Sequence, residues 1–144
     1  MMKVLLATAL AVMISGYAET AQSAVSGDFG PETLKLINSY RTSRGLSRLA
    51  ENRTVKALAL QHSREQAAHG SMNHDGFRQR LAQAKAAGLT GVCSENVGFG
   101  HQSAQQLFSR WRISPGHNAN MLQPNMRYGA VVVVGGYSTF FVCR

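Results

Sequence analysis

Residues 103–122, SAQQLFSRWRISPGHNANML, place a capped amphipathic helix directly before a polar turn. Ser103 is a good N-cap residue. Apolar residues then follow at the i, i+3, i+4, i+7 spacing of one helix face: Ala104, Leu107, Phe108 and Trp111. Because Pro115 cannot continue a helix, we expect the helix to end there and a loop to carry His117. Trp111 is expected in the core, where it anchors that loop.

Downstream of this stretch, the sequence predicts a C-terminal hairpin. Residues 128–134 and 137–143 are β-branched and aromatic runs on either side of Gly135-Gly136, a pair that a type I′ turn tolerates. The valine run lacks strict alternation, which predicts a central strand covered on both faces. Upstream, residues 91–100 are punctuated by glycine and predict a short strand through Val92 and Val97.

Three more helices are predicted towards the N-terminus. The first begins at Pro31 and stops at Gly45, the second is capped by Asn52 and ends at Gly70, and the third is capped by Asp75. His62 lies on the apolar face of the second helix, so we expect a hydrogen-bonded core histidine there rather than a ligand. Four helices and about three strands in mixed order predict an α+β fold, a three-layer α-β-α sandwich.

The first residues resemble a signal peptide. Lys3 is followed by an apolar run over residues 4–14, and a small-x-small cleavage site lies at residues 16–18, although cleavage as late as residue 26 fits nearly as well. The run is about half of the roughly 20 residues that span a bilayer, so we expect no transmembrane anchor. The sequence thus predicts a signal peptide (1–18), a flexible segment (19–30), one domain (31–144) and a secreted or periplasmic location.

The composition is basic, with 15 Lys and Arg against 7 Asp and Glu. Loss of residues 1–18 removes only Lys3 and lowers the formal net charge from +8 to +7. Such a charge suits attraction to anionic surfaces, but the arginines are spread over every segment, which favours solvated faces over a nucleic-acid site. In an oxidising compartment Cys93 and Cys143 favour a disulfide, with two buried thiols as the alternative.

Few residues are left to carry chemistry. The sequence has no HExxH, CxxC, GxSxG or P-loop motif, and Glu95 has no acidic neighbour nearby in sequence. The remaining candidates are polar residues expected in loops: His74, Glu95 and His117. Two imidazoles and one carboxylate are the donors of an open His₂Glu divalent-metal site, in which water takes the fourth position.

Several short motifs occur in a characteristic order: 36–52 LINSYRTSRGLSRLAEN, 59–63 ALQHS, 74–80 HDGFRQR, 95–100 ENVGFG and 111–122 WRISPGHNANML. Together they resemble bacterial CAP (SCP-like) domains, relatives of the cysteine-rich secretory, antigen 5 and plant pathogenesis-related proteins. The resemblance covers roughly residues 33–143. It implies an α-β-α sandwich with a cavity lined by histidines and acidic residues, which binds a divalent cation such as zinc in some members.

Carried over to this chain, the resemblance assigns His74, Glu95 and His117 to the cavity, with His74 and His117 as metal ligands. Asn96 and Asn120 are expected to fix their loops through bonds to the backbone. Arg80 is expected to pair with a carboxylate. The chain departs from the family pattern at Ser94, where glycine is usual, and after Tyr137, where tryptophan is common.

Two functions follow as hypotheses. We prefer a non-catalytic, monomeric binding domain outside the cytoplasm, whose cavity takes a weakly held Zn²⁺ or another divalent cation, a small lipid or an envelope-derived ligand, and which binds no nucleic acid. The alternative is a metal-dependent, peptidase-like hydrolase in which His74 and His117 hold zinc and Glu95 is the general base. That site needs a third protein ligand, for which His101 is the nearest spare histidine.

Overall fold

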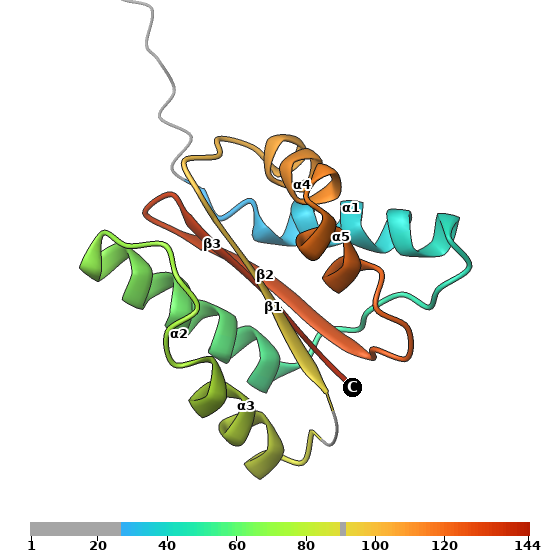
Figure 1. The fold of residues 1–144 in the computed structure, drawn as a ribbon, viewed down its shortest axis with the longest axis horizontal. Helices are drawn as coiled ribbons and strands as arrows, with labels where there is room; N and C mark the ends of the chain where they lie inside the picture. Colours follow the sequence, from blue (N-terminus) through green and yellow to red (C-terminus); the bar gives the residue numbers. More distant parts are fainter. Residues whose placement is uncertain (1–26, 90–91) are drawn as a thin grey trace, which may run out of the picture.

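A three-stranded antiparallel sheet runs through the middle of the computed structural model, which describes residues 27–89 and 92–144 (Figure 1). Its strands are β1 Cys93–Phe99, β2 Tyr128–Val134 and β3 Tyr137–Cys143. The helices are α1 Gly30–Ser43, α2 Arg53–His69, α3 Phe77–Ala86, α4 Ala104–Ile113 and α5 Pro115–Met121. In Figure 1 the sheet separates α1, α4 and α5 from α2 and α3. The predicted α-β-α sandwich is therefore confirmed.

Each face of the sheet carries its own apolar core. On one side Phe140 and Val142 pack with residues of α1 and α4, among them Ile37 and Trp111. On the other side Phe141 packs with residues of α2 and α3. Because successive strand residues point to opposite faces, a strand between two helix layers is apolar at every position. This explains the unbroken valine run.

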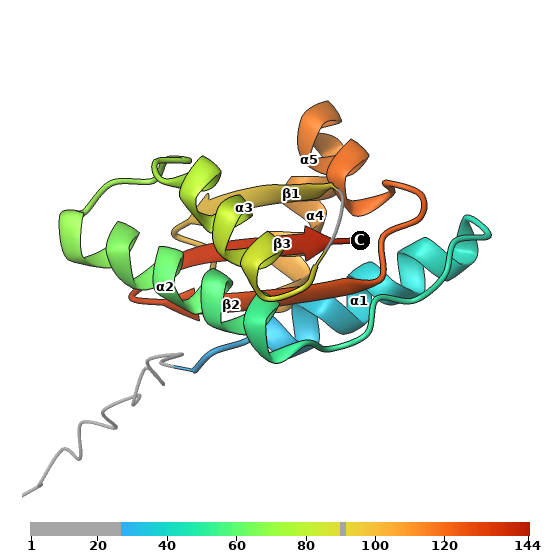
Figure 2. The same cartoon turned by 90° about the horizontal axis from the view of Figure 1, so that it is seen from below.

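The strand order differs from the expectation. Figure 2 shows the order β1-β3-β2, so β3 is central and the valine strand β2 lies at an edge. The prediction that β2 is covered on both faces is confirmed, but the prediction that β2 is the central strand was wrong. The edge is partly paired: Ala50 N donates to Arg127 O at 2.8 Å, and Val133 N donates to Asp28 Oδ1 at 2.9 Å.

Most of the predicted turn and cap chemistry is confirmed. Gly135 and Gly136 both have positive φ, 55° and 81°, as a type I′ turn requires. Asn52 Oδ1 accepts from Val55 N and caps α2, and Ser103 Oγ accepts from Gln106 N and caps α4.

Two predicted details were wrong. Asp75 does not cap α3, because left-handed Gly76, at φ 73°, takes the N-cap position. Pro115 does not open a loop. It starts α5 directly after α4, since a proline lacks only an N–H that the first helical turn leaves unbonded. His117 therefore lies on a helix.

The N-terminal end of the described chain is tied to the sheet. Gly30 N donates to Asp28 Oδ1 at 2.9 Å, and α1 begins at Gly30. A Cβ at Gly30 would lie 2.0 Å from Val131 O, so only glycine lets α1 start this close to β2. Residues 1–26, including the predicted signal peptide and most of the predicted flexible segment, lie outside the described residues. Over 27–89 and 92–144, no helix has the length and apolar content that crossing a bilayer requires.

The predicted disulfide is present. Cys93 and Cys143 are directly opposite each other on β1 and β3, and their Sγ atoms are bonded. Their Cα atoms are 4.1 Å apart. The bond fastens the start of β1 to the end of the central strand, next to the strand residues that carry the candidate site.

Candidate functional site

A buried ion pair lies at the centre of the candidate site. Arg80 on α3 donates from Nε to Glu95 Oε2 and from Nη2 to Glu95 Oε1, both at 2.8 Å. Both side chains are 2% exposed or less. Two parallel hydrogen bonds between a guanidinium and a carboxylate are strong and directional. The expectation that Arg80 pairs with a carboxylate is confirmed. Both carboxylate oxygens of Glu95 accept a hydrogen bond from Arg80.

His74 is bonded to the same carboxylate. Its Nδ1 lies 2.9 Å from Glu95 Oε1, while its side chain is 53% exposed. A carboxylate paired with arginine accepts hydrogen bonds, so His74 Nδ1 carries the proton. In the neutral form of the ring, the other nitrogen, Nε2, is then the unprotonated one and has a lone pair to offer.

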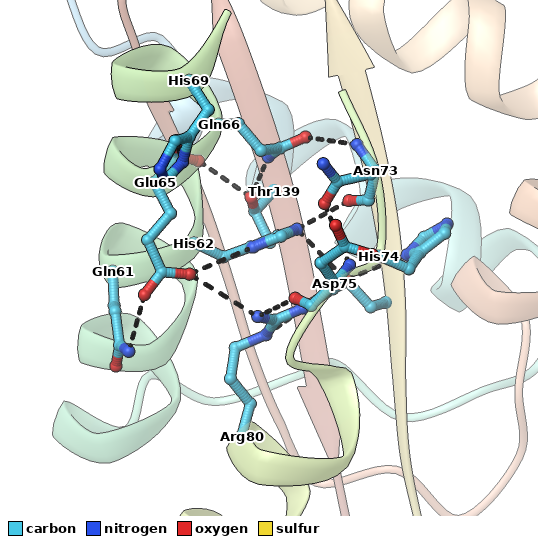
Figure 3. A network of polar contacts seen from close by, with 12 residues as sticks. Gln61, His62, Glu65, Gln66, His69, Asn73, His74, Asp75, Arg80 and Thr139 are labelled. Atoms are coloured by element: carbon cyan, nitrogen blue, oxygen red, sulfur yellow. Dashed lines mark hydrogen bonds and ion pairs between the residues drawn. The ribbon is translucent and has the colours of Figure 1, made fainter. Parts of the chain in front are cut away.

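His62 supports the loop that carries His74. It is 1% exposed, its Nε2 donates to Asn73 O at 2.7 Å, and the same nitrogen is 3.5 Å from Glu95 Oε1. Gln66, one turn further along α2, accepts from Asn73 N at 3.3 Å. The expected core histidine is confirmed. Its contacts hold residue 73 in place and so fix the position of His74 (Figure 3).

His117 lies on α5 and is held through its backbone. Asn96 Nδ2 donates to His117 O at 3.0 Å, and Asn120 Nδ2 donates to Asn96 Oδ1 at 2.9 Å and to Glu95 O at 3.2 Å. The two asparagines therefore bond to the backbone as predicted, but they do so from strand β1 and helix α5 and not from loops. Burial and, secondly, the charge of His74 hold the pKa of His117 below the ordinary histidine value of 6.5.

The three predicted site residues do not have equivalent places. Glu95 and Asn96 are neighbours on β1, so their side chains point to opposite faces: Glu95 towards Arg80 of α3 and Asn96 towards α5. The Glu95 carboxylate therefore lies on the α3 side of β1, where His74 bonds to it, and it points away from α5. His74 and His117 come close enough for the charge of one to lower the pKa of the other.

His101 does not complete a ligand set with these two histidines. Within the two ranges that the structure describes, no three side chains of His, Cys, Asp or Glu are arranged to hold a metal ion. Burial and the nearby charge of Arg110 lower the pKa of His101. The arrangement therefore offers the imidazoles of His74 and His117, the first of them oriented by a carboxylate.

The role of Glu95 was the main point that sequence reasoning missed. The sequence predicts Glu95 in a loop, as a cavity residue or a general base, whereas it is a strand residue whose two carboxylate oxygens both accept hydrogen bonds. The alternation rule gives a signal that could have found this. Once Ser94-Glu95-Asn96 is placed in a strand, Glu95 must face one helix layer and Asn96 the other.

The titration of His117 tests this geometry. We expect the His117 ring to titrate below 6.5 in the folded protein, and His74→Ala to move its pKa part of the way back, because the charge of His74 is one cause of the shift. A proton then binds more tightly to the unfolded chain, so acidification below about 6.5 lowers stability through His117. ¹H NMR of the ring protons measures both values. An unchanged pKa in the variant would show that the two rings are apart.

A sequence comparison identifies the family of the chain. The sequence model described as the cysteine-rich secretory protein family, CAP, matches residues 34–144. No curated protein sequence matches the chain.

Solved structures share the fold at low sequence identity. A cysteine-rich secretory protein from Staphylococcus aureus superposes with a TM-score of 0.67 at 19% identity, covering 79% of this chain and 38% of that one. An extracellular SCP-domain protein from Bacillus anthracis gives 0.72 at 20%, covering 80% and 40%. An outer surface protein from Borrelia burgdorferi gives 0.64 at 17%, covering 78% and 88%. The chain thus spans about two fifths of the first two proteins.

Proposed function

Because the chain belongs to the cysteine-rich secretory protein family, we propose that it is an exported, non-catalytic binding domain whose His74 and His117 hold a divalent cation such as Zn²⁺. The observation that carries this is the hydrogen bond between His74 Nδ1 and Glu95 Oε1. Metal-binding histidines characteristically donate their second N–H to a carboxylate, which fixes the tautomer and orients the ring. Here that bond turns His74 Nε2 into the available donor atom.

The donor set fits a weakly held, exchangeable cation. A structural zinc site has four protein ligands and a catalytic one has three. This chain supplies two imidazoles, and the low pKa of His117 keeps its ring neutral at neutral pH. The remaining coordination positions of the cation would be filled by water or by a small ligand derived from the cell envelope. The cation would then attach that ligand to the protein.

Export rests on two supports of different kinds. Residues 1–18 have the pattern of a signal peptide. Two of the proteins that share the fold are described as extracellular or outer surface proteins. A secreted or periplasmic location would also give the oxidising conditions in which the Cys93–Cys143 bond persists.

The hydrolase alternative has less support, because its general base is occupied. A base must reach the metal-bound water within hydrogen-bond distance and accept its proton. Both oxygens of Glu95 already accept from Arg80, and Oε1 also accepts from His74. We therefore place Glu95 as a positioning residue for His74.

Zinc titration by calorimetry tests the proposal. We expect the wild-type protein to bind one Zn²⁺, and His74→Ala and His117→Ala each to weaken binding at least about tenfold. His69→Ala is the matched control, since His69 is an exposed histidine whose Nδ1 bonds to its own helix at Glu65 O. Equal losses in all three variants would contradict the site. Tight zinc binding by the wild type, with casein cleavage that disappears in a Glu95→Gln protein that is still folded and still holds the zinc, would establish the hydrolase instead.

A further inference from the structure

A cavity beside α4 gathers most of the exposed large apolar side chains. Of four such side chains among the described residues, three line this cavity of about 530 Å³: Met72, Phe99 and Ile113, which are 51%, 55% and 69% exposed. They come from the loop after α2, the end of β1 and the end of α4. Val97 and Trp111 also line the cavity. We call it the apolar groove, and such exposed clusters with a polar rim mark binding sites.

The rim of the apolar groove is positively charged. Arg110, His101 and His117 line it, and among the residues that the structure describes no Asp or Glu does. Arg110 supplies the fixed charge. The groove therefore matches a ligand with an apolar body and a carboxylate beside it.

The edge of the sheet supplies main-chain bonding groups at the groove. Trp111 Nε1 donates to Val97 O at 3.0 Å, and Gly100 N donates inward to Gly136 O at 3.0 Å. By the alternation of an antiparallel ladder, Phe99 directs its N–H and C=O away from β3, as Val97 does. In the part of the chain that the structure describes, no hydrogen bond from outside the sheet reaches Phe99. Because Val97 O is already bonded to Trp111, the open part of this edge is the N–H and C=O of Phe99, and such free main-chain groups at a strand edge pair with extended peptides.

We propose that the apolar groove binds an extended peptide segment in which a bulky apolar residue is next to an acidic one. The peptide main chain pairs with Phe99, its apolar side chain lies between Phe99 and Ile113, and its carboxylate meets Arg110. A lone acyl chain would leave the Phe99 edge unpaired and most of its own surface in water. A peptide partner extends the proposed binding function. The peptide proposal rests on the proposed metal site only in that His117 borders both sites.

Trp111 provides a built-in reporter, because it is the single tryptophan of the chain and lines the groove. The probe is a panel of blocked pentapeptides without tryptophan, each with Phe, Leu or Ile next to Asp or Glu. The same panel with Lys in the acidic position, and sodium decanoate, are run in parallel. We expect saturable fluorescence changes with acidic members only.

Single substitutions test whether the peptide binds in the apolar groove. Ile113→Asp should weaken binding more than tenfold, and Arg110→Gln about two- to fivefold, the effect of one exposed charge pair. The matched control is Val92→Asp, at the fourth exposed apolar side chain, which lies outside the residues lining the groove and should leave binding unchanged. All three positions are exposed, so melting temperatures should stay close to wild type.

The peptide panel would overturn the proposal if no member binds, if decanoate binds and the peptides do not, or if lysine peptides bind as well as acidic ones. The proposal would also be wrong if the Ile113→Asp variant binds the peptides like wild type. His74→Ala separates this proposal from the metal site. It should lose zinc and keep the peptide. Loss of the peptide in that variant would place the peptide on the metal and away from the groove.

Discussion

Replacing Glu95 by glutamine is expected to lower the free energy of unfolding by about 3–5 kcal/mol, the usual cost of removing one partner from a buried ion pair. The side chain keeps its size, but one oxygen becomes an NH₂ group that cannot accept from Arg80. The buried guanidinium then keeps only the more distant carboxylate of half-exposed Glu65, whose Oε2 lies 3.9 Å from Arg80 Nη1. His74 also loses the acceptor that fixes its tautomer.

Urea unfolding at neutral pH measures this loss. Glu51→Gln is the control, because Glu51 is exposed and should change stability by less than about 0.5 kcal/mol. The double variant Arg80→Met/Glu95→Leu should recover much of the loss, because well-packed apolar side chains replace both charges. A loss below about 1 kcal/mol in Glu95→Gln would mean that the pair is not buried as described.

Removal of the disulfide is expected to have a comparable effect. Cys93 and Cys143 are 50 residues apart in sequence, and a cross-link over that length stabilises a fold by about 4 kcal/mol in the chain-entropy model. Cys93→Ala/Cys143→Ala should therefore unfold at a much lower urea concentration. Reductant should lower the wild-type midpoint to a similar extent and leave the variant unchanged. If reductant has no effect on the wild type, the two thiols are unbonded in solution.

Local chemistry made much of the fold predictable from the sequence. Asn52 and Ser103 cap helices and Gly135-Gly136 turns a hairpin because these effects depend on neighbouring residues alone. The strand order was not predictable in this way. A valine run buried on both faces is compatible with a central or an edge strand, and the pairing of β1 with β3, which is far away in sequence, places β2 at the edge.

The sequence pointed to candidate site residues, but it did not show how these residues bond to one another. The motif resemblance pointed to His74, Glu95 and His117; the structure joins His74 to Glu95, and the charge of His74 contributes to the low pKa of His117. What the sequence could not show is that Arg80, 15 residues before Glu95, occupies the carboxylate. That pairing depends on how α3 lies against β1, which is a matter of tertiary packing.

The tautomer of His74 tests the central claim most directly, because a bound cation needs His74 Nε2 unprotonated and Glu95 is the group that keeps it so. Long-range ¹H–¹⁵N correlation spectra of the imidazole nitrogens, recorded at pH 7.5 during addition of Zn²⁺, report each ring nitrogen separately. We expect His74 Nδ1 to remain protonated throughout, while His74 Nε2 and one nitrogen of His117 shift together with zinc. A His74 ring protonated on Nε2, or zinc-dependent shifts confined to His69 or His101, would contradict the account.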